Sequence, residues 1–146
     1  MLADPLALAP AAQRSHFSKL WRPQRVVFTP DVLDEEFGQQ ILARVLAQNL
    51  ELELLKSNRL IGLRDPDGDV RATYRTAKNT LAIVRAPAKA LRLQPTTPSA
   101  DWQLNLAQGC PAHCQYCYLA GSLSGPPVVK AFANLPQLLA NTAAYE

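Results

Sequence analysis

A strand–helix–strand pattern near the N-terminus constrains the fold of this chain more than any other feature. Residues 25–28, Arg-Val-Val-Phe, have the β-branched and aromatic composition of a short strand. From about Asp31 or Asp34 to Gln48, apolar residues recur at helical spacing and predict a helix with one buried stripe. Residues 50–55 alternate leucine with glutamate and predict a second strand. Strands joined through a helix run parallel, so the pattern predicts an α/β fold.

The remainder of the chain predicts shorter elements. Asp-Pro-Asp-Gly at residues 65–68 favours a turn, because each residue type suits its turn position. Three prolines interrupt residues 86–99, which we expect to be an extended connection. The alternation from Trp102 to Leu106 predicts a strand that runs directly into the cysteine-containing segment. Further expected elements are a strand at 81–84, a strand or extended coil at 128–132, and a helix at 135–145.

Composition excludes several classes of protein. With 146 residues, of which 48% are hydrophobic and 18% charged, the chain has the makeup of one folded domain rather than a disordered segment. No apolar run approaches the length of a membrane span, so no membrane role is expected. The N-terminal residues lack the basic start of a signal peptide, with Asp4 and Pro5 in its place. We therefore expect a cytoplasmic protein.

All three cysteines lie within eight residues, at Cys110, Cys114 and Cys117. An odd number at such short spacing does not suit a disulfide framework. Three thiolates in one loop can hold three corners of a [4Fe-4S] cluster, since soft sulfur ligands suit iron–sulfur chemistry. The chain has no fourth cysteine, so such a cluster would keep one iron open for a further ligand.

Two other interpretations of the cysteines remain. Zinc prefers four ligands in a closed site, and His113 or the distant His16 could supply the fourth. His113 is next to Cys114, so both side chains would have difficulty reaching one small tetrahedral ion together with Cys110 and Cys117. The three thiols could also be inert.

Positive charge is concentrated in the middle of the chain. Residues 56–92 contain nine basic residues against three aspartates, an excess of six positive charges over 37 residues. Such an excess can meet the phosphates of DNA, or it can form a solvated face with scattered arginines. The basic residues are Lys56, Arg59, Arg64, Arg71, Arg75, Lys78, Arg85, Lys89 and Arg92.

The spacing Cys-x-x-x-Cys-x-x-Cys, with Tyr116 before the last cysteine, resembles the cluster loop of radical S-adenosylmethionine enzymes. The wider sequence resembles one family of that superfamily, spore photoproduct lyase, from about Arg25 to the C-terminus. The segments that carry this resemblance are residues 74–81, 98–100, 109–110, 113–114, 116–119 and 134–135.

The resemblance implies a lyase that repairs ultraviolet-damaged DNA. In that family a [4Fe-4S] cluster binds S-adenosylmethionine, and an electron from a donor protein generates a radical that splits a thymine dimer into two thymines. By motif match, Cys110, Cys114 and Cys117 would ligate the cluster. Tyr116 and Tyr118 match tyrosines thought to transfer the radical; alternatively, both pack around the cluster and exclude water.

The resemblance also implies a fold and its extent. We expect an N-terminal strand–helix–strand region followed by the start of an incomplete (βα) radical S-adenosylmethionine barrel. The expected regions are a loosely ordered tail at 1–24, an α/β region at 25–100, and the beginning of the barrel with the cluster loop at 101–146. Only 29 residues follow Cys117, and none is a cysteine, although the family's hydrogen-donating cysteine follows its cluster loop.

We therefore expect an N-terminal fragment or truncated product that is inactive alone. Residues 125–127, Gly-Pro-Pro, depart from the family's pattern and leave the substrate open. Two alternatives remain: a radical S-adenosylmethionine enzyme of another substrate, or a non-catalytic fragment that binds an iron–sulfur cluster or zinc.

Overall fold

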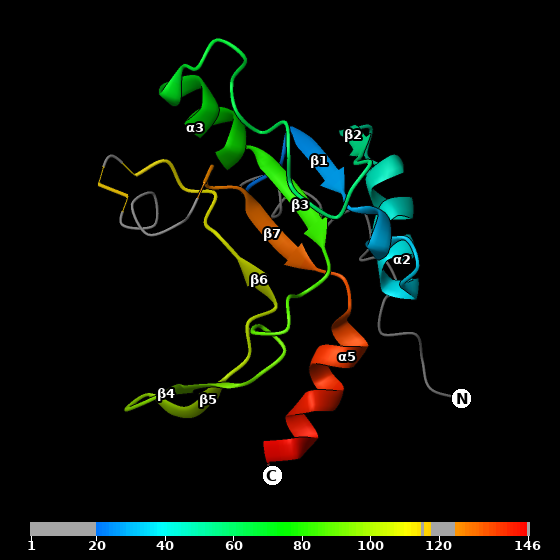
Figure 1. The fold of residues 1–146 in the computed structure, drawn as a ribbon, viewed down its shortest axis with the longest axis vertical. Helices are drawn as coiled ribbons and strands as arrows, with labels where there is room; N and C mark the ends of the chain where they lie inside the picture. Colours follow the sequence, from blue (N-terminus) through cyan, green and yellow to red (C-terminus); the bar gives the residue numbers. More distant parts are fainter. Residues whose placement is uncertain (1–19, 115, 118–124, 146) are drawn as a thin grey trace.

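The computed structural model describes residues 20–114, 116–117 and 125–145, which form a mixed α/β structure around a five-stranded sheet (Figure 1). The strands lie in the order β2-β1-β3-β7-β6. Their bounds are β1 Arg25–Phe28, β2 Glu51–Leu54, β3 Thr80–Val84, β6 Ala107–Gln108 and β7 Val129–Phe132. The α-helices are α2 Glu36–Leu46, α3 Val70–Lys78 and α5 Leu135–Ala140, with 3-10 turns at Pro30–Val32 and Asn141–Tyr145.

Strand direction divides the sheet into a parallel part and an antiparallel edge. β2, β1, β3 and β7 all run parallel, which confirms the parallel arrangement predicted from the first strand–helix–strand pattern. β6 runs antiparallel to β7, with Ala107 opposite Ala131. The end of β6 therefore lies at the edge of the sheet where the parallel strands begin.

Helix α2 covers one face of the sheet. Val26, Phe28 and Ile83 point to this face and pack with Val45, a member of the apolar stripe that the sequence predicts. The helix is shorter than the predicted segment, and Leu46 at its end is exposed. A short helix suffices because the strands that it covers are only four or five residues long.

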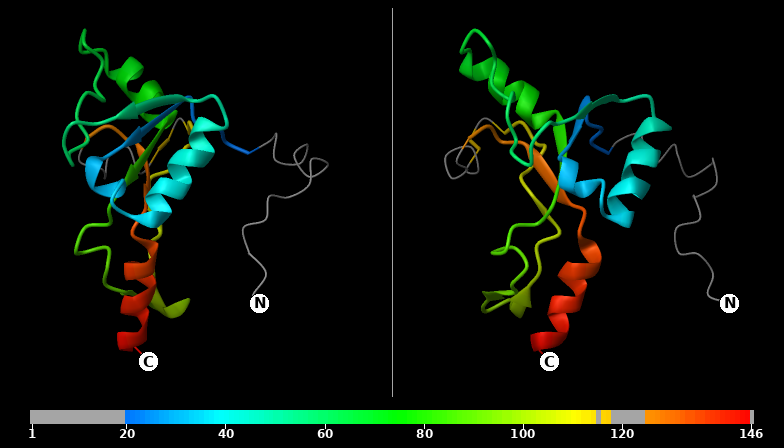
Figure 2. Two further views of the ribbon diagram at one scale, coloured as in Figure 1. Left: turned by 90° about the vertical axis from the view of Figure 1, so that its right-hand side faces the viewer. Right: turned by 45° about the vertical axis from the view of Figure 1, so that its right-hand side comes forward.

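The opposite face packs against α3 and the segment before it (Figure 2). Val27 and Ala82, which alternate with the residues facing α2, contact the cluster that contains Ala77 of α3. Burial on both faces is typical of a parallel sheet and accounts for the continuous apolar composition of β1. Helix α3 itself was not among the elements predicted from the sequence.

The strand predicted at Trp102–Leu106 is wrong in its extent. The structure places Trp102 in a hairpin of β4 Gln94–Thr96 and β5 Ala100–Gln103 instead. The chain then leaves the hairpin and forms the two-residue strand β6. Alternating side chains specify an extended backbone but not which strand it pairs with, and here two different partners divide the segment. The helix predicted at 135–145 is present as α5 and a following 3-10 turn.

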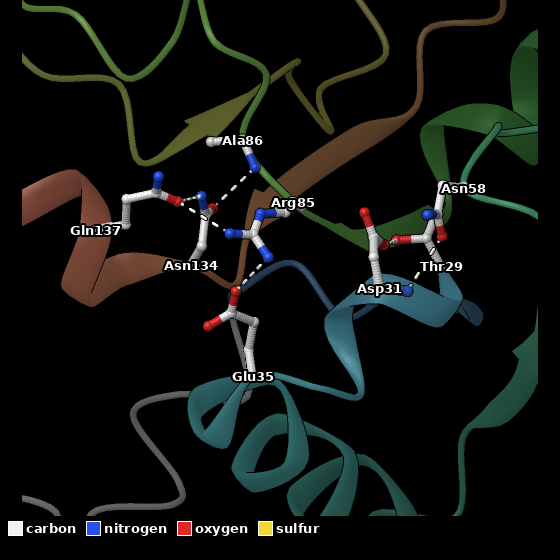
Figure 3. A network of polar contacts seen from close by, with 8 residues as sticks. All are labelled: Thr29, Asp31, Glu35, Asn58, Arg85, Ala86, Asn134 and Gln137. Atoms are coloured by element: carbon white, nitrogen blue, oxygen red, sulfur yellow. Dashed lines mark hydrogen bonds and ion pairs between the residues drawn. The ribbon is translucent and has the colours of Figure 1, made fainter.

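Polar side chains close the edge at which the parallel strands end (Figure 3). Asn134 is 1% exposed, accepts a 2.8 Å hydrogen bond from the Ala86 amide and donates to Gln137 at 2.9 Å. Arg85 bridges Gln137 and Glu35, and so joins α5 to the start of α2. This network ties three elements together across one end of the sheet.

Among the described residues, no helix has the length and apolar character of a membrane span.

Candidate metal centre

The cysteine-containing segment begins where β6 ends, at the edge where β3 and β7 start. Gly109 connects the strand to Cys110 with a φ of +96°, a conformation that favours glycine. A Cβ atom at this position would lie 2.6 Å from the Val128 carbonyl oxygen. Glycine thus lets the segment pass against the start of β7, and Cys110 follows directly from this close approach.

Helix α3 faces the cysteine segment, and two local contacts fix how it begins. Asp69 caps the helix by accepting a 2.8 Å hydrogen bond from the Arg71 amide. The amide of Asp65 donates to the Thr73 hydroxyl at 2.8 Å, which holds the preceding turn against the helix. The helix ends at Lys78, four residues after Tyr74, so these two side chains share one face.

Lys78 is fully buried and its ammonium group contacts the cysteine segment. Its Nζ atom donates to the Cys110 carbonyl oxygen at 2.6 Å and lies 3.7 Å from the Cys117 sulfur. The same nitrogen is 5.5 Å from the centre of the Tyr74 ring, within the range of a cation–π interaction. Lys78 thus contacts both ends of the segment that carries the three cysteines.

Tyr74 lies beside the cysteines as well. Its ring meets the ring of His113 edge to face, with 6.1 Å between centroids. Its hydroxyl is buried and meets no partner of ordinary hydrogen-bond geometry within the described part of the chain. A hydrogen bond to the Cys117 side chain is nevertheless the largest cause that raises the pKa of Tyr74, followed by burial and by the negative charge that the three cysteines carry as thiolates. Tyr74 therefore stays a neutral phenol among the sulfur atoms.

The cysteines differ in exposure: Cys110 and Cys117 are half-buried, whereas Cys114 is exposed, and none is in a disulfide. Within the described ranges, no three His, Cys, Asp or Glu side chains are grouped so as to hold a metal ion. The Tyr116 side chain is 95% exposed. Tyr118 lies outside the described residues.

A family model supplies the observation that decides where this chain belongs. The model described as "Spore photoproduct lyase" matches residues 21–146, which include the whole sheet and the cysteine segment. The chain belongs to the spore photoproduct lyase family.

Individual members of the spore photoproduct lyase family agree with this assignment. The chain is 32% identical over 124 residues to the enzyme of a Geobacillus species, and 30% identical over 118 residues to that of Bacillus subtilis. These alignments cover 84% and 80% of this chain, but only 35% and 33% of the relatives. The chain thus spans about a third of the length of the curated relatives it matches.

Solved structures of spore photoproduct lyase share the fold. One, complexed with dinucleoside spore photoproduct, is 28% identical with a TM-score of 0.74, and the match covers 86% of this chain and 36% of that one. A variant with bound AdoMet and dinucleoside spore photoproduct matches with the same TM-score. The predicted α/β class and family are therefore confirmed, with the match confined to part of the longer enzymes.

The residues present fit the cluster that this family implies. Three thiols, which are soft ligands, lie in one segment. As thiolates, all three contribute to the raised pKa of Tyr74. A buried ammonium group lies beside two of these residues, where its charge would offset that of thiolates bound to a cluster. Unlike a single metal ion, a cubane does not require its cysteine sulfurs to converge on one atom, because each binds a separate iron.

The sequence pattern indicates the three cysteines but gives no role to Tyr74 or Lys78. Both belong to the segment 74–81 that carries the family resemblance, and Lys78 was counted among the basic residues available to DNA. The structure removes Lys78 from that group, since it is buried against the cysteines. A capping aspartate at Asp69 and the four-residue spacing of Tyr74 and Lys78 were the signals that could have indicated a helix facing this site.

Proposed function

We propose that this chain forms the cluster-binding part of a radical S-adenosylmethionine lyase that splits spore photoproduct in ultraviolet-damaged DNA into two thymines. The family match across the cysteine segment carries this proposal. Since the chain spans about a third of its relatives, further residues are needed to complete a site for the lesion. We accordingly propose that this chain does not turn over the lesion by itself.

The cysteine segment would hold a [4Fe-4S] cluster through Cys110, Cys114 and Cys117. When loaded and reduced by an electron-donor protein, such a cluster supplies the electron that cleaves bound S-adenosylmethionine. Tyr74, kept as a neutral phenol by its neighbours, can donate a hydrogen bond to a sulfur ligand. Tyr116 and Tyr118 are proposed as radical-transfer residues. We also propose that the protein is located in the cytoplasm.

A cleft of about 370 Å³ shares Tyr74 with this site. Arg64, Thr73 and Tyr74 line it from α3 and the preceding segment, and residues 125–127 line the other side. Prolines at 126 and 127 restrict the backbone dihedral angles of this side of the cleft.

Exposed arginines on α3 and on the connection that leads to it support DNA binding. Arg71 and Arg75 are exposed on α3, and Arg59 and Arg64 are exposed on the connection that leads to it. Arg85, in contrast, is held in an ion pair with Glu35 at 2.7 Å. We therefore assign the phosphate contacts to α3 and its preceding connection rather than to the whole range 56–92.

Anaerobic reconstitution with iron and sulfide tests the cluster. We expect about four irons per chain and a cluster spectrum that changes when S-adenosylmethionine is added. Replacing Cys114 with alanine should abolish both the bound iron and the cluster spectrum, because it removes a ligand. Since Cys114 is exposed, the change should leave the packing of the chain intact. A colourless protein that retains one zinc per chain would replace the proposal with the zinc-binding alternative. A cluster that ignores S-adenosylmethionine would favour a non-catalytic iron–sulfur module.

Salt dependence tests the DNA surface. Affinity for duplex DNA should fall as salt rises, and replacing Arg71 and Arg75 with glutamine should reduce the log–log slope by about 2 if each contacts one phosphate. Arg44→Gln, on exposed α2, is the matched control and should leave the slope unchanged. Equal slopes for all three proteins would exclude α3 from the interface, and cluster binding with no DNA affinity would favour a different substrate.

A further inference from the structure

The Lys78 side chain contacts both ends of the cysteine segment. It is fully buried, and its Nζ atom reaches the Cys110 backbone at 2.6 Å and the Cys117 sulfur at 3.7 Å. Neither ion pair among the described residues involves Lys78. A buried ammonium without a carboxylate costs free energy unless other groups supply negative charge and hydrogen-bond acceptors. Here a carbonyl, a sulfur and an aromatic face surround it.

The position of Lys78 in the chain makes its direction rigid. The residue ends α3, and the next strand begins two residues later at Thr80, in the middle of the parallel sheet. The Thr80 hydroxyl donates to the Thr76 carbonyl at 2.7 Å, which secures the passage from helix to strand. Ala77, the preceding residue, is packed in the core. The ammonium is therefore presented to the cysteines from a fixed frame.

We propose that Lys78 is a positioning residue for the cluster: it anchors the segment through the Cys110 carbonyl and stabilises the reduced state by its charge beside Cys117. This inference rests on the proposed function, since it requires a cluster at the three cysteines. Three thiolates outweigh the positive charge of a [4Fe-4S] core, so the loaded site is negative and becomes more so on reduction. A fixed cation beside a sulfur ligand favours that reduction.

The two parts of the role predict separate measurements on reconstituted protein. Lys78→Met keeps an unbranched side chain only one atom shorter but removes both the donor and the charge. It should lower the iron retained per chain at least several-fold on gel filtration, because the Cys110 end of the segment is no longer held. The fraction of cluster that remains should show a more negative midpoint potential, measured by EPR-monitored titration. Lys78→Arg keeps a donor and a charge and should restore a potential close to the original.

Controls separate failure of this inference from failure of the proposed function. Iron content of the unaltered chain comes first: if it takes up no cluster, the proposed function fails before Lys78 is tested. Arg44→Met, an exposed basic residue on α2, should retain full iron content and the original potential. Circular dichroism and thermal unfolding of Lys78→Met identify a folding defect.

If Lys78→Met fails to fold, Lys78→Gln, which retains a donor without the charge, takes its place; it should keep most of the iron yet show the negative potential shift. A folded Lys78→Met or Lys78→Gln protein with the iron content and potential of the unaltered chain would overturn the inference.

Discussion

The two edges of the parallel sheet differ in how their polar groups are satisfied. At the edge where the strands end, Asn134 is buried with both ends of its side-chain amide in hydrogen bonds, and Arg85 is paired with Glu35. At the edge where the strands begin, a buried ammonium faces a backbone carbonyl and a thiol, and a buried phenol lacks a partner of ordinary geometry within the described residues. The first arrangement is complete within the protein, whereas the second suits a negatively charged group held by sulfur.

The two edges therefore differ in the groups that they carry. Open parallel sheets commonly bind ligands beyond the carboxyl ends of their strands. In this chain the Asn134 network and the start of α5 lie at that edge. The cysteine segment reaches the opposite edge because β6 runs antiparallel to β7. The direction of this two-residue strand thus determines which edge carries the cysteine segment.

The largest effect should follow from removing a cluster ligand. Replacing Cys117 with serine is expected to reduce bound iron from about four per chain to nearly none, because the oxygen is a poor substitute for a soft thiolate. Thermal unfolding of the apo-protein should change little, since Cys117 is only half-buried. Full retention of iron in this variant would show that the cluster lies elsewhere.

A substitution at Gly109 should impair the same edge by backbone strain. Alanine at this position would have to adopt a φ of +96° with its Cβ atom 2.6 Å from the Val128 oxygen. We expect a loss of about 1–3 kcal/mol in the free energy of unfolding, together with reduced iron uptake as the segment shifts. Urea denaturation and iron analysis measure the two effects. Gly68→Ala is a matched control for positive φ, since its Cβ atom would meet no neighbour. If Gly109→Ala loses stability but keeps its iron, the backbone strain at Gly109 does not affect the placement of the cysteine ligands.

Asn134→Ala tests the completed edge. The change leaves the buried Ala86 amide without its acceptor, and we expect a loss of about 1–3 kcal/mol in the free energy of unfolding. Iron content per folded chain should remain that of the unaltered protein. A fall in iron content with little loss of stability would contradict the division between the two edges.

Arg85→Gln should have the smallest effect. Its ion pair with Glu35 is partly exposed, with side-chain exposures of 44% and 24%, so solvent screens the attraction. Such pairs contribute about 0–1 kcal/mol, and salt reduces the contribution further. Urea denaturation at low and high salt measures it. A loss well above this range would mean that Arg85 supports the Asn134 network as well as the ion pair.

The sequence predicted the part of the fold that depends on apolar periodicity. The first strand, α2, the second strand and their parallel pairing follow from residues that face a core on a regular repeat. Helix α3 was missed because its inner face includes Tyr74 and Lys78, and a lysine is ordinarily taken as a surface residue. The hairpin of β4 and β5 was missed because pairing partners depend on tertiary structure.

The candidate site was predictable only in part for a related reason. The spacing of the three cysteines indicates a candidate cluster site without any knowledge of the fold. Lys78 and Tyr74 lie more than 30 residues before Cys110, and only the packing of α3 beside the cysteine segment gives them a role. Tyr116 stays a predicted radical-transfer residue, placed here with its ring exposed.

Hydrogen–deuterium exchange of the apo-protein and the reconstituted protein tests the central claim most directly, because one experiment reports on both edges. We expect slower exchange on cluster loading in peptides that cover residues 70–78 and 109–117. Peptides that cover residues 84–86 and 134–138 should exchange at the same rate in both forms. Protection confined to the Asn134 edge, or equal protection at both edges, would contradict the assignment of the cluster to the cysteine edge.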